Sequence, residues 1–193
     1  MARTQADDYE EKRAAIRDSA AMLFAQKGFA AASIAEIARA SGVSKSLIYH
    51  YYGAKDEILF DLMSAHVREL FAVASEPSQE EPHAAFRSLT RRLLARYVGA
   101  AAKQKVLLDE LQALPEQRRR AIIETQRAII ARVEAALCAA RPALAADRAL
   151  LRVKAMLYFG MLNWTHTWFD PAGAVSRERL ADMAAETILQ SAP

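Results

Sequence analysis

Residues 33–52, SIAEIARASGVSKSLIYHYY, constrain the fold of this chain more than any other segment. A short amphipathic run begins at Ser33 and stops at Gly42, and a second short run follows from Ser44. Ser33 and Glu36 have the S-x-x-E spacing of a capping box, and Ser44 is a favourable N-cap for the second run. Gly42 adopts a positive φ at little steric cost. The segment therefore predicts two short helices joined by a tight turn.

The second of these helices carries side chains that suit a nucleic acid. It holds a cation, an imidazole and hydroxyls at Lys45, Ser46, Tyr49 and His50, and the hydroxyl of Ser44 at its start suits phosphate oxygens. Lysine binds guanine edges or phosphate, and tyrosine contacts a base, a thymine methyl group or phosphate. Because a helix-turn-helix offers its second helix to the major groove, the segment favours DNA binding. The alternative is a packing hairpin inside an ordinary helical bundle.

Residues 12–60 resemble the DNA-binding domain of the TetR family of transcriptional regulators. The matching features are a first helix ending in LFAQKGFAAAS, the IAEIARASGVSKSLIYHYY hairpin and the GAKDEIL start of a connecting helix. The resemblance implies a three-helix DNA-binding head in residues 1–54 and a helical domain for ligand binding and dimerisation in residues 55–193. By the family pattern, the residues that match DNA-contacting positions are Ser33, Lys45, Ser46, Tyr49, His50 and Lys55. Tyr52 stands where many relatives have phenylalanine, and the resemblance assigns its hydroxyl no role.

The composition predicts an all-α protein of about nine helices. Among 193 residues there are six glycines and six prolines, and no stretch alternates polar and apolar residues as a strand does. The expected helices span 9–27, 34–40, 45–51, 55–74, 84–102, 104–113, 116–140, 148–169 and 176–190. The longest apolar run, MLYFGMLNW, is far shorter than the roughly 18 residues of a membrane span. The polar N-terminus MARTQADDYEEK is not typical of a signal peptide, so we expect a cytoplasmic protein with no membrane partner.

The charge distribution supports the motif. The net charge is only +3, but residues 12–55 hold seven basic residues against two acidic ones, a local balance of +5. A basic head gives the salt-dependent attraction to phosphate that a DNA-binding protein needs. Since basic runs on solvated helices are common, this observation supports the DNA-binding interpretation without establishing it.

The sequence lacks the signatures of an enzyme or a metalloprotein. Its four histidines are scattered, its single cysteine, Cys138, lies in an apolar helical stretch, and there is no nucleophile elbow, P-loop or dinucleotide-binding glycine pattern. We therefore expect no catalytic activity, no metal and no cofactor other than an effector ligand.

The helix expected at 148–169 predicts a homodimer. It is apolar nearly all round, and a helix of this kind must be covered on every face. With the narrower apolar stripe of 176–190, it could form a four-helix interface between two subunits, as the family resemblance also implies. A dimer suits a palindromic DNA operator, because two recognition helices one turn apart read its two halves. The alternative is a monomer with a tightly packed core.

An effector site is also expected in the second domain. Apolar cavities with a few polar groups bind small ligands, and the candidate walls are Tyr97, Met156, Phe159, Asn163, Trp164 and Thr167, any of which could instead be plain core. The segment FGMLNWTHTWFDPAGAVSRERLA resembles acyl-CoA-responsive members of the family, which implies a repressor released from DNA by an acyl-CoA. The alternative is a drug- or other small-molecule-sensing regulator of an efflux system with the same head.

A coenzyme A effector would need cations for its phosphates. Arginine suits phosphate recognition, and the candidates on two expected helices are Arg87, Arg91, Arg92, Arg96, Arg118, Arg119 and Arg120. Arginines are more often exposed to solvent than used for ligand binding. The sequence alone therefore leaves both roles open for these residues.

Overall fold

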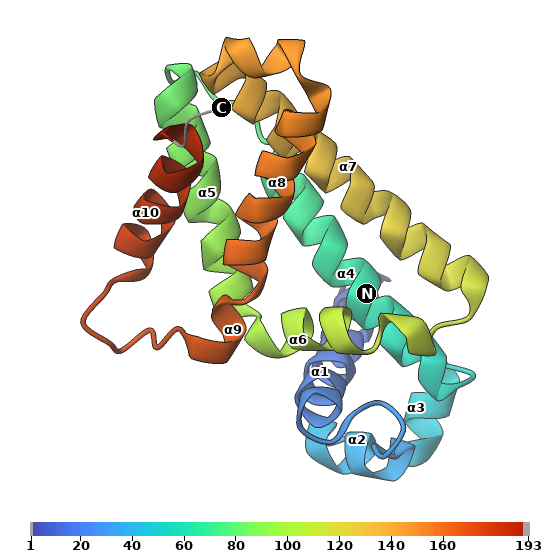
Figure 1. Cartoon of the computed structure of the whole chain (residues 1–193). Coiled ribbons are helices and arrows are strands. Elements are labelled where there is room, and N and C mark those ends of the chain that lie inside the picture. Colours follow the sequence, from blue (N-terminus) through green and yellow to red (C-terminus); the bar gives the residue numbers. More distant parts are fainter. Residues whose placement is uncertain (1, 191–193) are drawn as a thin grey trace. The chain divides into compact units, whose positions relative to one another are not determined.

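The computed structural model describes residues 2–190, with side chains from Asp8 onward, and over this range the chain is helical without any strand (Figure 1). The α-helices are α1 (Ala2–Lys27), α2 (Ile34–Ser41), α3 (Lys45–Tyr51), α4 (Lys55–Ser75), α5 (Pro82–Gly99), α6 (Ala101–Asp109), α7 (Glu116–Ala140), α8 (Arg148–Asn163), α9 (Thr165–Trp168) and α10 (Arg177–Gln190). Two 3-10 turns, η1 (Leu111–Ala113) and η2 (Pro142–Ala146), complete the set. The predicted all-α fold is confirmed. None of these described helices is both long and apolar enough to cross a membrane.

The helix predicted over 148–169 is divided at Trp164 into α8 and α9. The hydroxyl of Thr165 donates to the carbonyl of Leu162 at 2.7 Å, and the hydroxyl of Thr167 donates to the carbonyl of Trp164 at 2.7 Å. Threonine side chains that take backbone carbonyls compete with helical hydrogen bonds and favour a bend. The division therefore follows from two threonines placed just past the end of a strongly apolar helix.

The described chain divides into two compact units. The first contains the residues up to His66 together with Ala102–Ile122, and the second contains Val67–Ala101 and the residues from Ile123 onward. Helices α4 and α7 thus contribute residues to both units. The boundary predicted after residue 54 gives two domains that are each continuous in sequence. The first unit of the structure is instead discontinuous, because the 102–122 segment groups with the helix-turn-helix.

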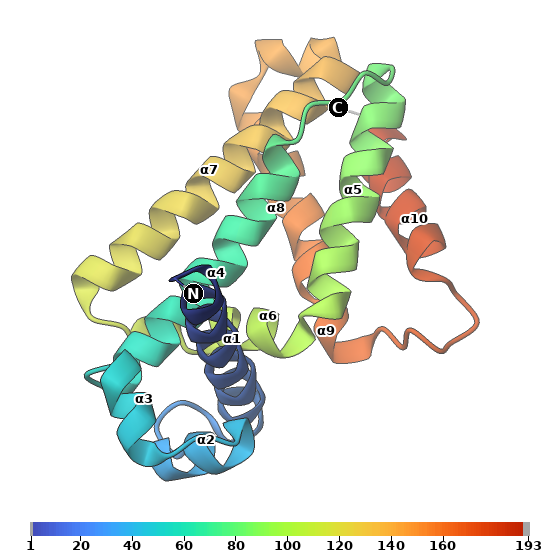
Figure 2. The same ribbon diagram turned by 180° about the vertical axis from the view of Figure 1, so that it is seen from behind.

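The helices of the first unit, drawn in Figures 1 and 2, pack through buried apolar residues. In α1, Ile16 and Phe24 are almost completely buried, as their spacing of two turns on one helix face predicts. Ile37 of α2, Ile48 of α3 and Ile58 of α4 are each 0% exposed. One buried isoleucine from each of these three helices therefore supports α2 and α3 on α1 and α4.

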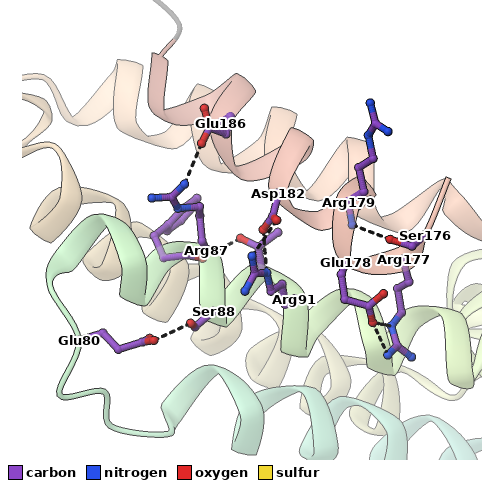
Figure 3. A network of polar contacts seen from close by, with 12 residues as sticks. Glu80, Arg87, Ser88, Arg91, Ser176, Arg177, Glu178, Arg179, Asp182 and Glu186 are labelled. Atoms are coloured by element: carbon purple, nitrogen blue, oxygen red, sulfur yellow. Dashed lines mark hydrogen bonds and ion pairs between the residues drawn. The ribbon is translucent and has the colours of Figure 1, made fainter.

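The second unit is organised by α5, α8 and α10. Phe86 and Tyr158 pack with ring centroids 5.4 Å apart, and the Tyr158 hydroxyl donates to Thr90 Oγ1 at 3.2 Å. Helices α5 and α10 lie side by side in both views, and ion pairs join their outer faces (Figure 3). Arg91 makes two contacts of 2.7 Å with the Asp182 carboxylate. Because exposed pairs contribute little stability, the buried aromatic and aliphatic residues hold this unit together.

Candidate nucleic-acid interface

The first helix of the helix-turn-helix has the predicted caps at both ends. Ser33 Oγ accepts from the Glu36 amide at 3.2 Å, and the Ser33 amide donates to Glu36 Oε2 at 3.0 Å, which completes the capping box. Hydrogen bonding and ion pairing with Lys27, then the bonds from Ser33, lower the pKa of Glu36 to about 2. At the other end Gly42 has φ +70°, so a residue with a Cβ would be strained there. The sequence therefore defines α2 closely.

The second helix, α3, is anchored by one residue and exposes most of the others. Ser44 Oγ accepts from the Leu47 amide at 3.0 Å and caps the helix. Ile48 is completely buried, while Tyr49 is 50% exposed. Lys45, Ser46 and His50 are also exposed. Among the residues predicted to contact DNA, the exposed ones are Ser33, Ser44, Lys45, Ser46, Tyr49 and His50.

Most cations of the first unit whose side chains are described form ion pairs with carboxylates of the protein. Lys12 pairs with Asp8, Lys27 pairs with Glu36, and two arginines of α1 pair with Asp61. Arg39 and Lys45 make no ion pair among the described residues, and Lys45 Nζ lies 5.8 Å from the centroid of the Tyr49 ring. Arg39, one of the seven basic residues within 12–55, is therefore a cation available to an external anion, as Lys45 is.

Lys55 lies differently from the other predicted contacts. Its Nζ donates to the carbonyls of Phe29, Ala30 and Ala32 at 2.6, 3.2 and 2.8 Å. The ammonium also lies 4.5 Å from the centroid of the Phe29 ring. These contacts bind the ammonium to the turn between α1 and α2. Lys55 therefore stabilises this turn in the structure.

The Tyr52 hydroxyl has a partner that sequence reasoning did not identify. It donates to Asp61 Oδ2 at 2.7 Å, and Arg13 and Arg17 approach the same oxygen at 2.8 and 3.3 Å. Burial and then this hydrogen bond raise the pKa of Tyr52. Burial opposes ionisation of Asp61, but the Tyr52 bond and the two arginines outweigh it and lower the pKa of Asp61. Asp61 therefore ties the residue that ends α3 to α1 and α4.

The second unit has an extended apolar surface on α8, α9 and α10. Its members are side chains more than half exposed, namely Val153, Met156, Leu157, Trp164, Trp168 and Met183. Val153, Met156 and Leu157 of α8 have the spacing of one helix face, and Gly160 and the C-cap Trp164 continue it. We call this surface the α8 face. Large contiguous apolar surfaces of this kind mark interaction sites.

The six predicted effector residues do not converge on one cavity. Tyr97 and Phe159 are 4% and 6% exposed and belong to the core, whereas Met156 and Trp164 are 51% and 62% exposed on the α8 face. Asn163 is half-buried and Thr167 is exposed. The second unit does contain a cavity of about 330 Å³ between α5, α8, α9 and α10. Of the six residues, Trp164 lines it.

The arginines considered for coenzyme A phosphates are paired with protein groups. On α5, Arg87 pairs with Glu186 (Figure 3), with Nη1 and Oε1 3.0 Å apart, and Arg92 Nε lies 3.2 Å from Glu76 Oε2. The other pairs are Arg91 with Asp182, Arg96 with Glu69, Arg118 with Asp56 and Glu57, and Arg120 with Glu116. Arg119 donates to the carbonyl of Leu114 at 3.4 Å. A phosphate would therefore have to displace a carboxylate at nearly every one of these positions.

Comparisons with known proteins match both parts of the chain. The family described as "Bacterial regulatory proteins, tetR family" matches residues 16–62, and the "Tetracyclin repressor-like, C-terminal domain" matches residues 79–192. The chain is 47% identical over 51 residues to the HTH-type transcriptional regulator HbdR of Aromatoleum sp. (strain CIB), a match that covers 26% of this chain and 22% of HbdR. This chain therefore spans about a fifth of the length of HbdR in that match. With the HTH-type transcriptional regulator TtgR of Pseudomonas putida the identity is 25% over 141 residues, or 67% of each protein.

Solved structures agree over nearly the whole chain. A TetR-family transcriptional regulator from Bordetella parapertussis 12822 is 39% identical, with a TM-score of 0.84 and coverage of 93% of this chain and 94% of that one. AibR in complex with isovaleryl coenzyme A and operator DNA is 23% identical, with a TM-score of 0.76 and coverage of 91% and 97%, and this likeness shows the fold alone. Because one family model covers more than half of the chain and the Bordetella structure agrees along both units, the chain belongs to the TetR family of transcriptional regulators.

Proposed function

We propose that this chain is a transcriptional repressor that binds a palindromic DNA operator as a homodimer and is released by a small hydrophobic effector. The observation that carries the proposal is the surface of α3, where polar and aromatic side chains stay exposed on a helix held by buried Ile48. Family membership supports the same interpretation, since TetR regulators bind operator DNA as dimers and bind small-molecule effectors.

In this proposal Lys45 and Tyr49 read the major groove. Lys45 is an exposed cation without an ion pair among the described residues, and Tyr49 stands next to it with half of its surface exposed. The hydroxyls of Ser33, Ser44 and Ser46, with the ring of His50, then supply contacts to phosphates and sugar. Arg39 adds a second cation available to the DNA backbone.

Replacing Lys45 or Tyr49 by alanine tests this assignment. Each substitution is expected to weaken operator binding by about 1–3 kcal/mol if the side chain contacts a base, and Lys45→Ala should lower the salt slope of binding by about one. Fluorescence anisotropy with labelled operator DNA at several salt concentrations measures both quantities. Lys12→Ala is the matched control, because this exposed lysine of the same unit pairs with Asp8. Wild-type affinity in both α3 variants would remove α3 as the reading helix.

The α8 face supports the homodimer in this proposal. Six large apolar side chains there are each more than half exposed, and a second copy would cover them. Two α8 helices and two α10 helices would form a four-helix interface, in which Gly160 lets the helices approach closely. The pairing would present two α3 helices to the two halves of a palindrome.

The nature of the effector is proposed from the cavity of the second unit. Its volume of about 330 Å³ is within the range of small-ligand sites, and apolar residues dominate its walls, including Leu94, Trp168 and Met183. The fold shared with AibR, whose structure contains isovaleryl coenzyme A, supports an acyl-CoA. The paired arginines instead favour an effector without phosphates, such as a drug recognised by an efflux regulator. Both candidate effectors, the acyl-CoA and the drug, would place an apolar group in this cavity.

Operator release separates the two candidates. If the acyl group is what the protein recognises, isovaleryl-CoA should lower operator affinity at least tenfold and raise the Tm, whereas coenzyme A alone should do neither. Fluorescence anisotropy and a thermal-shift assay measure these effects, with chloramphenicol as a hydrophobic probe that lacks phosphates. Release by chloramphenicol but not by isovaleryl-CoA would establish the alternative effector class. Equal effects of coenzyme A and isovaleryl-CoA would contradict recognition of an apolar group.

A further inference from the structure

The 102–122 segment belongs to the same compact unit as the helix-turn-helix, although about 50 residues separate the two in sequence. It comprises most of α6, the turn η1 and the first turns of α7. Lys103 Nζ of this segment lies 2.7 Å from Asp18 in α1, and Gln104 Oε1 lies 2.8 Å from His66 Nε2 in α4. The segment is therefore fastened to the helices that carry α2 and α3.

One contact of this segment reaches the turn that precedes α2. The amide of Phe29 donates to Glu110 Oε1 at 2.9 Å, with Glu110 located directly after α6. Gly28, the neighbouring residue, has φ +80°, and a Cβ there would lie 3.2 Å from the same oxygen. The glycine thus leaves room for the carboxylate and also accepts the backbone conformation of the turn.

The same turn is held from its other side by Lys55. Its ammonium collects three carbonyls between Phe29 and Ala32, and Ser33, the N-cap of α2, follows immediately. A carboxylate therefore holds an N–H of the turn and an ammonium holds its C=O groups. With both sides fixed by charged groups, the position of the α2 N-terminus depends on Glu110 as well as on α4.

A second contact of the segment reaches the turn that follows α3. Arg118 donates to Asp56 at 2.5 Å and to Glu57 at 2.9 Å. Glu57 in turn accepts from the Gly53 amide at 2.8 Å, one residue beyond the C-cap of α3. The Gly53 bond and then Arg118 lower the pKa of Glu57. The segment thus contacts the chain just before α2 and just after α3.

We infer that Glu110 is a positioning residue for DNA recognition, because it fixes the α1–α2 turn from the 102–122 segment and so sets the placement of α2 and α3. The inference rests on the proposed DNA-binding function and adds a residue outside the helix-turn-helix to it. Without this acceptor, the turn samples more conformations in the free protein. Ordering the turn when α3 enters the groove then costs more conformational entropy, so operator affinity falls. Arg118 secures the other end of the same helix pair.

Operator affinity of Glu110 variants tests the inference. The operator is the sequence that wild-type protein selects from random duplex DNA. Glu110→Ala is expected to weaken binding to it at least tenfold, whereas Glu110→Gln, which keeps an Oε1 acceptor for the Phe29 amide, stays within threefold. Glu116→Ala is the matched control from the same segment, because this exposed carboxylate pairs only with Arg120 among the described residues, and it should bind like wild type. Circular dichroism establishes that each variant is folded.

Amide hydrogen exchange, compared between amides of the same variant, separates a local change at the turn from a general loss of stability. The Phe29 amide should exchange at least tenfold faster in folded Glu110→Ala than in wild type, whereas the amides of α8 in the second unit should exchange alike in both proteins. If Glu110→Ala does not fold, Glu110→Asp, whose carboxylate is one methylene shorter, takes its place, and wild-type exchange at Phe29 together with wild-type operator affinity in this variant overturns the inference. Wild-type operator affinity in Glu110→Ala, or an equal loss in Glu116→Ala, overturns it too. Failure of wild-type protein to select any DNA would instead overturn the proposed function.

Discussion

Replacing Leu157 by glutamate is expected to raise the dimer dissociation constant by about a hundredfold and to abolish tight operator binding. Leu157 is 59% exposed in the middle of the α8 face, where a partner subunit would cover it. A carboxylate buried there without a partner would cost about 2–4 kcal/mol of association free energy. Operator affinity falls with it, because a single subunit contacts one half of the palindrome. Sedimentation velocity over a range of concentrations measures the change.

Leu108→Glu is the matched control for this experiment. Leu108 is an exposed leucine, at 37%, but it belongs to α6 in the first unit. Its replacement introduces the same charge away from the α8 face, so the dimer should persist. A dimer of unchanged strength in Leu157→Glu would show that the α8 face is not the subunit interface.

Replacing Asp61 by asparagine is expected to destabilise the fold by about 2–3 kcal/mol at pH 7, because two part-buried arginines lose their shared carboxylate. The Asp61 side chain is 12% exposed and accepts from Tyr52 as well. Tyr52→Phe removes only that hydrogen bond, so its cost should be smaller, about 1.5 kcal/mol. Urea unfolding followed by circular dichroism gives both values. Asp18→Asn is the control, because the Asp18 side chain is 63% exposed in its pair with Lys103, and it should change stability by less than about 0.5 kcal/mol.

The pH dependence of the Asp61 effect has a definite sign. Its folded pKa lies below the unfolded value of about 3.9, so its contribution is present above pH 4 and is lost as the pH falls through the folded pKa. The difference in unfolding free energy between wild type and Asp61→Asn should therefore be constant from about pH 5 to 8 and shrink below about pH 4. A difference that grew on acidification would contradict the assignment of Asp61 as an ionised partner of the arginines.

Local chemistry explains why much of the head could be predicted from the sequence. Capping by Ser33 and Ser44, the positive φ at Gly42 and the buried stripe of α1 depend on residues within a few positions of one another. Periodicity also located the apolar α8 helix correctly. Its end at Asn163 was not predicted, because the two threonine hydroxyls that follow it do not alter the spacing of the apolar residues.

Long-range pairing explains what the sequence did not predict. Lys55, Asp61 and Glu110 take partners 23–26, 9–48 and 81 residues away, and no spacing rule identifies such pairs. The predicted effector residues illustrate a second limit of prediction from the sequence. When a helix is apolar on all sides, its sequence does not indicate which side packs into the core. Tyr97 and Phe159 lie in the core, while Met156 and Trp164 lie on the α8 face. The domain boundary after residue 54 and the DNA contacts themselves stay predictions.

Selection of DNA by the purified protein tests the central claim most directly. Wild-type protein is incubated with random duplex DNA, the bound fraction is sequenced, and the stoichiometry on the enriched sequence is measured by sedimentation. We predict enrichment of a palindrome whose half-sites are spaced by whole helical turns, bound by an even number of subunits and lost when Lys45 and Tyr49 are replaced together. Absence of any enriched sequence, or enrichment that survives this double replacement, would contradict the account.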